Sequence, residues 1–157
     1  ASRPGFELPI LIIVTNNKWG ISPPSHTQHG EKRISDRGLA FGMKTMNING
    51  NDVEESWFAI EEAMNYIRKE RKPVLIEAHV SRLYGHSSAT GANFIENEKD
   101  CLAEFEARLE KAGVLKRKEM EEIREQYTKD ILEMAKKYKF IGLTRLHVSA
   151  WNKTTGV

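Results

Sequence analysis

The sequence predicts an α/β fold, part of a doubly wound parallel sheet followed by C-terminal helices. Two apolar segments, residues 9–14 and 74–80, have the length of strands, and an amphipathic helical pattern lies between them. Alternating strands and helices are typical of parallel sheets covered by helices. The last third of the chain has helical periodicity only. We therefore expect a sheet domain over residues 1–96, a helical extension over 97–140 and a tail over 141–157.

The first strand, residues 9–14, has no polar residues alternating with its apolar ones. Continuous apolar strands of this type are usually buried on both faces of a parallel sheet. A strand buried in this way needs neighbours that are reached by crossover connections, so we expect the chain to begin within a larger domain. A polar loop with Gly and Pro follows over residues 18–32.

Three short elements are expected after this loop. A helix is predicted over residues 35–43 and a weak strand over 44–48, and residues 49–52 (NGND) have the composition of a turn. Asp52, with Glu55 three residues later, resembles a capping box, which marks the start of a helix.

The helix that starts there carries apolar residues at spacings of three and four, which place them on one face. These residues are Val53, Trp57, Ile60, Met64 and Ile67. Pro73 disfavours a helical residue before it, so the helix should end near residue 71 and the second apolar strand should follow.

The C-terminal third contains two further helices, over residues 97–112 and 116–138. Gly113 is a plausible stop between them. The second helix has a narrow apolar stripe on an otherwise charged surface, formed by Met120, Ile123, Tyr127, Ile131, Met134 and Tyr138. Such a stripe favours packing on its own domain, and docking against a partner subunit is the alternative.

Composition excludes several classes of function. With 24 Lys and Arg against 22 Asp and Glu, the net charge of +2 gives no basic surface for nucleic acid. The apolar run over residues 8–14 is too short to cross a membrane, and no segment resembles a secretory leader. One cysteine, Cys101, leaves no intrachain disulfide and fits a reducing compartment. We expect a cytoplasmic protein.

Two polar blocks follow the predicted apolar strands, where parallel sheets bind ligands. Asn16 and Asn17 come after the first strand, and residues 82–87 (RLYGHS) come after the last. Each block has a simpler explanation, because Asn pairs form side-chain to backbone turns and a Ser can cap a helix. His26 and His29 have metal-like spacing, but no third ligand accompanies them and a solvated pair is expected.

Taken together, five blocks resemble the alpha subunit of the thiamine-diphosphate-dependent 2-oxo acid dehydrogenases, in the decarboxylating component and most like the branched-chain (2-oxoisovalerate) type. The resemblance covers residues 8–127. The blocks are residues 16–24 (NNKWGISPP), 37–42 (RGLAFG), 49–53 (NGNDV), 73–78 (PVLIEA) and 82–87 (RLYGHS). It implies the thiamine-diphosphate-binding fold and makes this chain the C-terminal half of an alpha subunit or alpha region.

The resemblance implies a thiamine diphosphate and Mg²⁺ site. Asn17 would give Mg²⁺ a side-chain oxygen and Trp19 a backbone carbonyl, which suits a hard cation. Arg82 and His86 would bind the cofactor, Arg82 through its planar donor fork and His86 also as the catalytic group that donates or accepts protons. The family's Gly-Asp-Gly, whose Asp is the anionic metal ligand, precedes the part of the family that this sequence covers.

Ser87 aligns with a serine that mitochondrial relatives phosphorylate to switch the enzyme off. A phosphate beside the cofactor's diphosphate would oppose binding through like charge. Here Ala89 and Thr90 replace the Ser-Asp that usually follows. The sequence therefore departs from the regulatory pattern, and Ser87 is a possible regulatory residue only.

The implied reaction is oxidative decarboxylation of a 2-oxo acid, with transfer of the acyl group to lipoamide, the disulfide acceptor of this oxidoreductase. The implied partners are a beta subunit or beta region and the lipoyl domain of the acyltransferase component, and a bacterial cytoplasm is favoured over the mitochondrial matrix. The chain alone should be inactive. The alternatives are a subunit-interaction domain without catalysis and a transketolase-like thiamine-diphosphate enzyme.

Overall fold

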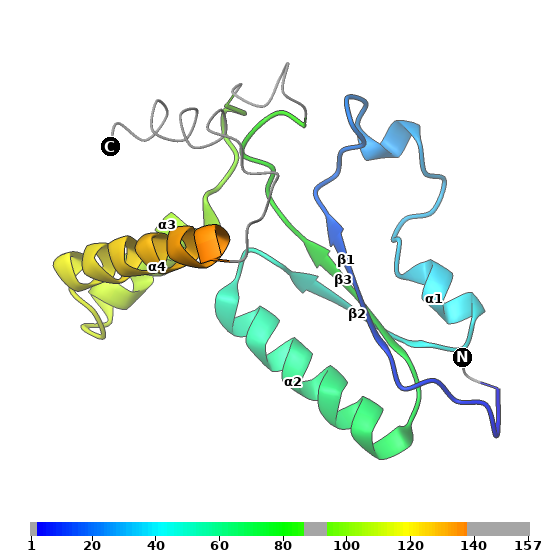
Figure 1. Ribbon diagram of the computed structural model, residues 1–157. Helices are drawn as coiled ribbons and strands as arrows, with labels where there is room; N and C mark the ends of the chain where they lie inside the picture. The colour runs from blue at the N-terminus through cyan, green and yellow to red at the C-terminus, as the bar shows by residue number, and fades with distance from the viewer. Residues whose placement is uncertain (1–2, 87–93, 138–157) are drawn as a thin grey trace. The chain divides into compact units, whose positions relative to one another are not determined.

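The computed structural model describes residues 3–86 and 94–137 of the chain (Figure 1). It divides into two compact units, one up to Phe105 and the other from Glu106 onward. The predicted tail, residues 141–157, lies outside the described residues. Within those that are described, no helix combines the length and the apolar character that a membrane span requires.

The first unit is built on a three-stranded parallel sheet, as the α/β prediction requires. The strands are β1 (Leu11–Asn16), β2 (Lys44–Asn49) and β3 (Val74–His79), in the order β1-β3-β2. Glu77 of the central strand lies opposite Val14 of β1 and Asn47 of β2. The crossovers bring the carboxyl ends of all three strands to one edge of the sheet.

The two faces of β3 are covered by different helices, α1 (Asp36–Ala40) and α2 (Val53–Glu70), which lie on opposite sides of the sheet in Figure 1. Side chains alternate between the faces of a strand. The α2 face is an apolar core of buried residues from α2, β2 and β3: Ile48, Ala59, Ala63, Ile67, Val74, Ile76 and Ala78. On the α1 face, Leu75 lies so near Gly38 that an added Cβ there would be 3.4 Å from the Leu75 side chain.

The expectation that the first apolar strand is buried on both faces is wrong. In β1 the side chains of Ile12 and Ile13 are 37% and 48% exposed. The physical reason is position, since among the described residues β1 is an edge strand of the sheet and only β3 pairs with it. The central strand β3 shows the burial predicted for β1, with every residue from Val74 to Ala78 buried.

The apolar face predicted for α2 is present on the helix, but most of it is not buried. Of its members only Ile67 is buried, and Trp57 is 69% exposed. The helix packs instead through Ala59, Ala63 and Ile67. Small residues let a helix axis approach a sheet closely, so close packing here selected the Ala positions over the large apolar stripe beside them.

The ends of α2 follow the predicted signals. The Asp52 carboxylate accepts the backbone N–H groups of Glu54 and Glu55 at 2.9 and 3.0 Å. The Glu55 carboxylate accepts from the N–H of Asn49 at 3.1 Å, so the second half of the capping box closes on the end of β2. The helix ends at Glu70, and the capping residue Arg71 has a left-handed φ of 55°, two residues before buried Pro73.

The second unit contains α4 (Arg117–Lys137) and the end of α3 (Cys101–Lys111), joined through Gly113 at a φ of 69°. Met120 of α4 is buried, but the rest of the predicted stripe is exposed from Ile123 to Met134. Packing of the whole stripe on its own domain is therefore not what the described residues show. Tyr138 lies outside them.

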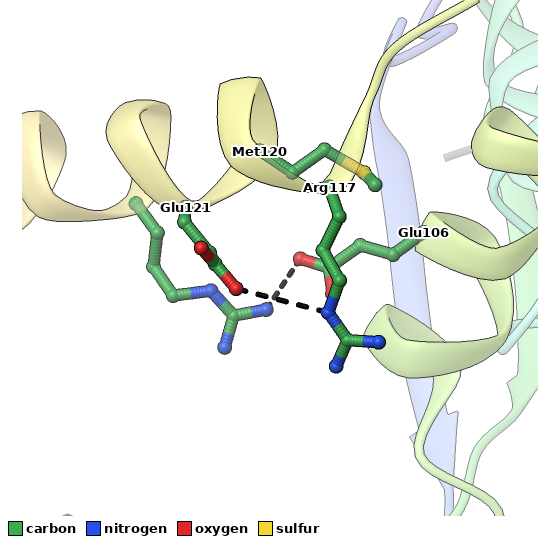
Figure 2. Close-up of a pocket in the computed structure, with 5 residues that line it drawn as sticks. Glu106, Arg117, Met120 and Glu121 are labelled. Carbon is green, nitrogen blue, oxygen red and sulfur yellow. Dashed lines mark hydrogen bonds and ion pairs between the residues drawn. The ribbon is translucent and has the colours of Figure 1, made fainter. Parts of the chain in front are cut away.

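A pocket of about 230 Å³ in this second unit is lined mostly by charge pairs (Figure 2). Arg124 pairs with Glu106 across the two helices, and Arg117 pairs with Glu121 at 3.7 Å along α4. Each of these charged side chains pairs with an opposite charge within the pocket. We therefore interpret the pocket as a polar contact between α3 and α4.

Candidate functional site

The loops that follow the three strands lie against one another at the carboxyl edge of the sheet. The N–H of Val80 donates to the carbonyl of Asn16 at 3.0 Å, and the N–H of Gly50 donates to the carbonyl of His79 at 2.8 Å. A Cβ on Gly50 would lie 2.7 Å from Val80 and 2.9 Å from Ala78. Only glycine allows the turn after β2 to approach β3 this closely.

The loop after β1 opens with two successive turns made by asparagine side chains. Asn16 Oδ1 accepts the N–H of Lys18, and Asn17 Oδ1 accepts the N–H of Trp19, both at 2.9 Å. Lys18 between them has a φ of 63°, which costs a residue with a Cβ conformational energy. The Asn pair therefore forms the side-chain to backbone turns that were the simpler explanation for it. These turns fix Asn17 and Trp19 in one tight bend.

The same loop folds back on itself beyond Trp19. Trp19 pairs with Pro24 in an isolated bridge, and the N–H of Ser25 donates to the carbonyl of Lys18 at 2.8 Å. A Cβ on Gly20 would lie 2.3 Å from the Gln28 side chain. The bend that holds Asn17 and Trp19 is therefore closed by contacts within its own loop.

Arg82 joins the two predicted blocks. Its guanidinium donates to the carbonyls of Gly20 and Ile21 at 3.1 and 3.2 Å and lies 5.8 Å from the centre of the Trp19 ring. Its Nε donates to the carbonyl of Tyr84 at 3.0 Å. Arg82 thus ties the loop after β1 to the loop after β3, with most of its donors engaged by backbone carbonyls.

The loop after β3 is held at both of its described ends. Ser81 exchanges two hydrogen bonds with the Asn51 side chain, at 2.7 and 3.0 Å. Farther along, the rings of Tyr84 and Phe94 meet edge to face with centroids 5.7 Å apart. His86 is exposed, and Ser87, Ala89 and Thr90 lie outside the described residues.

Sequence reasoning missed Glu77, which is fully buried beside this site. Its Oε1 accepts the side-chain amide of Asn16 at 2.7 Å, and its Oε2 accepts the N–H of Ser35 at 2.8 Å. Burial raises the pKa of Glu77, but the hydrogen bonds from Ser35 and Asn16 outweigh it and hold that pKa below its ordinary value. The available signal was a charged residue in the middle of an apolar strand.

His26 and His29, together with Asn16, line a hollow of about 290 Å³ in the loop after β1. His29 Nδ1 lies 3.2 Å from the Arg37 guanidinium and 3.7 Å from the Glu31 carboxylate. In the part of the chain that the structure describes, no three His, Cys, Asp or Glu side chains cluster as metal ligands.

The residues at the loop after β1 fit part of a Mg²⁺ site. The Asn17 side chain and the Trp19 backbone both offer neutral oxygens, and they are placed in the same bend. Mg²⁺ takes six oxygens in octahedral array and usually includes carboxylate or phosphate oxygens. The two groups present therefore suit this ion, and the anionic ligands must come from outside the bend.

Comparison with known proteins relates most of the chain to one family. The family model described as "Dehydrogenase E1 component" matches residues 5–141. The chain is 30% identical over 146 residues to the pyruvate dehydrogenase E1 component subunit alpha of Acholeplasma laidlawii, an alignment that covers 87% of the chain and 42% of that protein.

Two further relatives are named for 2-oxoisovalerate instead of pyruvate. The 2-oxoisovalerate dehydrogenase subunit alpha of Bacillus subtilis is 36% identical over 117 residues, covering 69% of the chain and 36% of that protein. Its mitochondrial counterpart in Mus musculus is 36% identical over 84 residues, covering 54% of the chain and 19% of that protein. The chain thus spans less than half the length of these relatives.

Proposed function

The chain belongs to the dehydrogenase E1 component family, as a relative of the alpha subunits of thiamine-diphosphate-dependent 2-oxo acid dehydrogenases, and we propose that it forms one wall of the cofactor site of such an enzyme. The observation that carries the proposal is the bend of Asn17 and Trp19, held by Arg82 from the other block. Residues far apart in the sequence thereby meet at the carboxyl edge of a parallel sheet, where such folds bind ligands.

In this proposal Asn17 and Trp19 hold Mg²⁺ through the side-chain oxygen and the backbone carbonyl. Arg82 orients their loop through Gly20 and Ile21 and would supply positive charge for the diphosphate. When bound, thiamine diphosphate supplies the electron sink that decarboxylation of a 2-oxo acid requires. His86, exposed beyond Arg82, would donate or accept the proton, since an imidazole ring carries one nitrogen that donates and one that accepts.

The proposed substrate is a branched-chain 2-oxo acid, and the acyl group passes to lipoamide. The relatives named for 2-oxoisovalerate are 29 to 38% identical to the chain and those named for pyruvate are 26 to 30% identical, over alignments of different length, and this difference supports the branched-chain type. The transketolase-like alternative is set aside because the family match is to dehydrogenase E1 components. Turnover of 3-methyl-2-oxobutanoate against a ketose phosphate by the parent enzyme checks the reaction class.

The proposed partners are a beta subunit or beta region and a lipoyl domain, in a bacterial cytoplasm. We propose the domain division 1–96, 97–140 and 141–157 for the same parent, with Ser87 as its candidate phosphorylation site. The exposed apolar stripe of α4 supports a second role, that of a subunit-docking segment. The two roles are compatible in one alpha subunit.

Titration with Mn²⁺ in place of Mg²⁺, with thiamine diphosphate present, tests the metal assignment. Paramagnetic broadening of amide signals in the nuclear magnetic resonance spectrum should centre on Asn17 and Trp19. Asn17→Ala should abolish it, whereas Asn65→Ala, an exposed position on α2, should not. Broadening that is unchanged in Asn17→Ala would contradict the metal assignment.

Calorimetry gives a second check on the same proposal. The chain should not bind Mg²⁺ and thiamine diphosphate tightly, because the anionic ligands lie outside its bend. A dissociation constant below about 1 μM would contradict this part of the proposal.

A further inference from the structure

The loop between β1 and α1, residues 17–34, is anchored at both of its ends to one side chain. Asn16, immediately before the loop, donates its side-chain amide to Glu77 Oε1. Ser35, immediately after the loop, donates its backbone N–H to Glu77 Oε2. Asn16 and Ser35 lie 61 and 42 residues from Glu77 in the sequence, so the carboxylate fixes two distant segments with its two oxygens.

The anchor at Asn16 extends into the bend itself. Asn16 uses its amide nitrogen to reach Glu77 and its Oδ1 to accept the N–H of Lys18. Lys18 is the left-handed residue at a φ of 63°, and it separates Asn17 from Trp19. A strained backbone conformation persists only where its surroundings hold it, and here one of the holding groups is an asparagine that is itself fixed by a buried carboxylate.

The anchor at Ser35 is reinforced from β2. Asn47, opposite Glu77 in the sheet, donates its side-chain amide to the Ser35 hydroxyl at 2.8 Å. Ser35 is 1% exposed and Glu77 is 0% exposed. Hydrogen bonds to a charged group are stronger than those between neutral groups, and this carboxylate is buried away from solvent.

We propose that Glu77 is a positioning residue for the Asn17 and Trp19 bend, which it holds in shape by clamping both ends of the loop. This inference rests on the proposed function for its metal, whereas the clamp itself concerns only the shape of the loop. Glu77 faces Asn16 and Ser35 and touches neither of the residues assigned to Mg²⁺.

Amide hydrogen exchange of the full chain tests the clamp. Glu77→Gln keeps the size of the side chain, but its NH₂ group must face one of the two donors, so at least one anchor is lost. Glu77→Ala loses both. We expect exchange of the Lys18 and Ser35 amides to speed up roughly tenfold or more in Glu77→Ala, in line with the loss of a charged hydrogen bond.

Ile76→Val is the matched control. Ile76 precedes Glu77 on the same strand, is equally buried and faces α2 instead of the loop. It should speed exchange across the core without singling out Lys18 and Ser35. If the Glu77 variants change all amides in the same proportion as Ile76→Val, the residue is only structural and the proposal is wrong.

Asn16→Ala keeps the proposal testable if the Glu77 variants do not fold. It should speed exchange of Lys18 and leave Ser35 within about twofold of the wild type, because Ser35 still bonds the carboxylate. If Asn16→Ala speeds exchange of the Lys18 and Ser35 amides equally, the two anchors are not separate and the proposal is contradicted.

Mn²⁺ broadening separates this inference from the proposed function. If the wild type shows no broadening at Asn17 and Trp19 but the Glu77 variants still release the loop, the metal assignment fails and the clamp stands. The clamp is contradicted if the wild type shows the broadening and Glu77→Gln changes neither the exchange of the Lys18 and Ser35 amides nor the Mn²⁺ concentration that produces the broadening. We expect roughly tenfold more Mn²⁺ to be needed in Glu77→Ala, as for other residues that orient metal ligands.

Discussion

The guanidinium of Arg82 lies 5.8 Å from the centre of the Trp19 ring and donates to the two backbone carbonyls that follow Trp19 in the chain. A planar, always-charged group with five donors can stack on an indole and bind several carbonyls at once. Trp19 and Arg82 belong to loops after different strands. Their contact is what turns two separate sequence blocks into one site.

Arg82→Lys should therefore loosen the Trp19 loop although the charge is kept. A lysine has one ammonium and cannot reach the carbonyls of Gly20, Ile21 and Tyr84 together. We expect a loss of about 1 kcal/mol in the free energy of unfolding, measured by urea denaturation, and a shift of the Trp19 indole signal. Arg68→Lys, at an exposed position of α2, is the control and should change neither. An unmoved Trp19 signal would count against Arg82 as the link.

Gly50→Ala should destabilise the carboxyl edge of the sheet. The new Cβ would lie 2.7 Å from Val80 and 3.1 Å from the carbonyl of His79, so β3 and the turn must separate. The expected cost is about 1–3 kcal/mol in the free energy of unfolding. Gly30→Ala meets nothing within 4 Å and should stay within about 1 kcal/mol of the wild type. Equal effects of the two substitutions would contradict the close approach.

Acid should remove the contribution of Glu77 to stability. The pKa of Glu77 is lowered in the folded chain, so the folded state prefers the carboxylate more than the unfolded state does. The stabilisation is fully present above the unfolded value of about 4.3 and is lost as pH falls below it toward the folded value. The gap in unfolding free energy between wild type and Glu77→Gln, from urea curves at pH 7 and pH 3, should therefore narrow on acidification. A gap that is constant with pH would rule out this linkage.

The apolar stripe of α4 should mediate association. Ile123, Tyr127, Ile131 and Met134 are 45 to 65% exposed, and exposed apolar surface of this extent often marks an interface. Light scattering after size-exclusion chromatography should give a mass above that of the monomer at high concentration. Ile131→Gln should return the mass to the monomer, and Lys129→Gln, on the opposite face of α4, should not. A monomeric wild type at high concentration would count against the docking role.

Local signals in the sequence were enough to locate most elements. The turn at residues 49–52, the cap at Asp52 and the stop before Pro73 depend on residues a few positions apart, so they could be read without the fold. The sequence did not show which face of α2 is buried. Its apolar stripe and its Ala positions are both compatible with a helix, and only the distance to the sheet chose the Ala face.

The sequence by itself determined the α/β order of elements, the polar blocks at the strand ends and the resemblance that names a cofactor. Tertiary structure alone decided that β1 is an edge strand with Ile12 and Ile13 exposed, and that Arg82 holds the Trp19 loop. It also decided that Glu77 clamps Asn16 and Ser35, which no local pattern connects. The physical reason is that burial and hydrogen-bond partnership depend on which distant segments the parallel crossovers bring together.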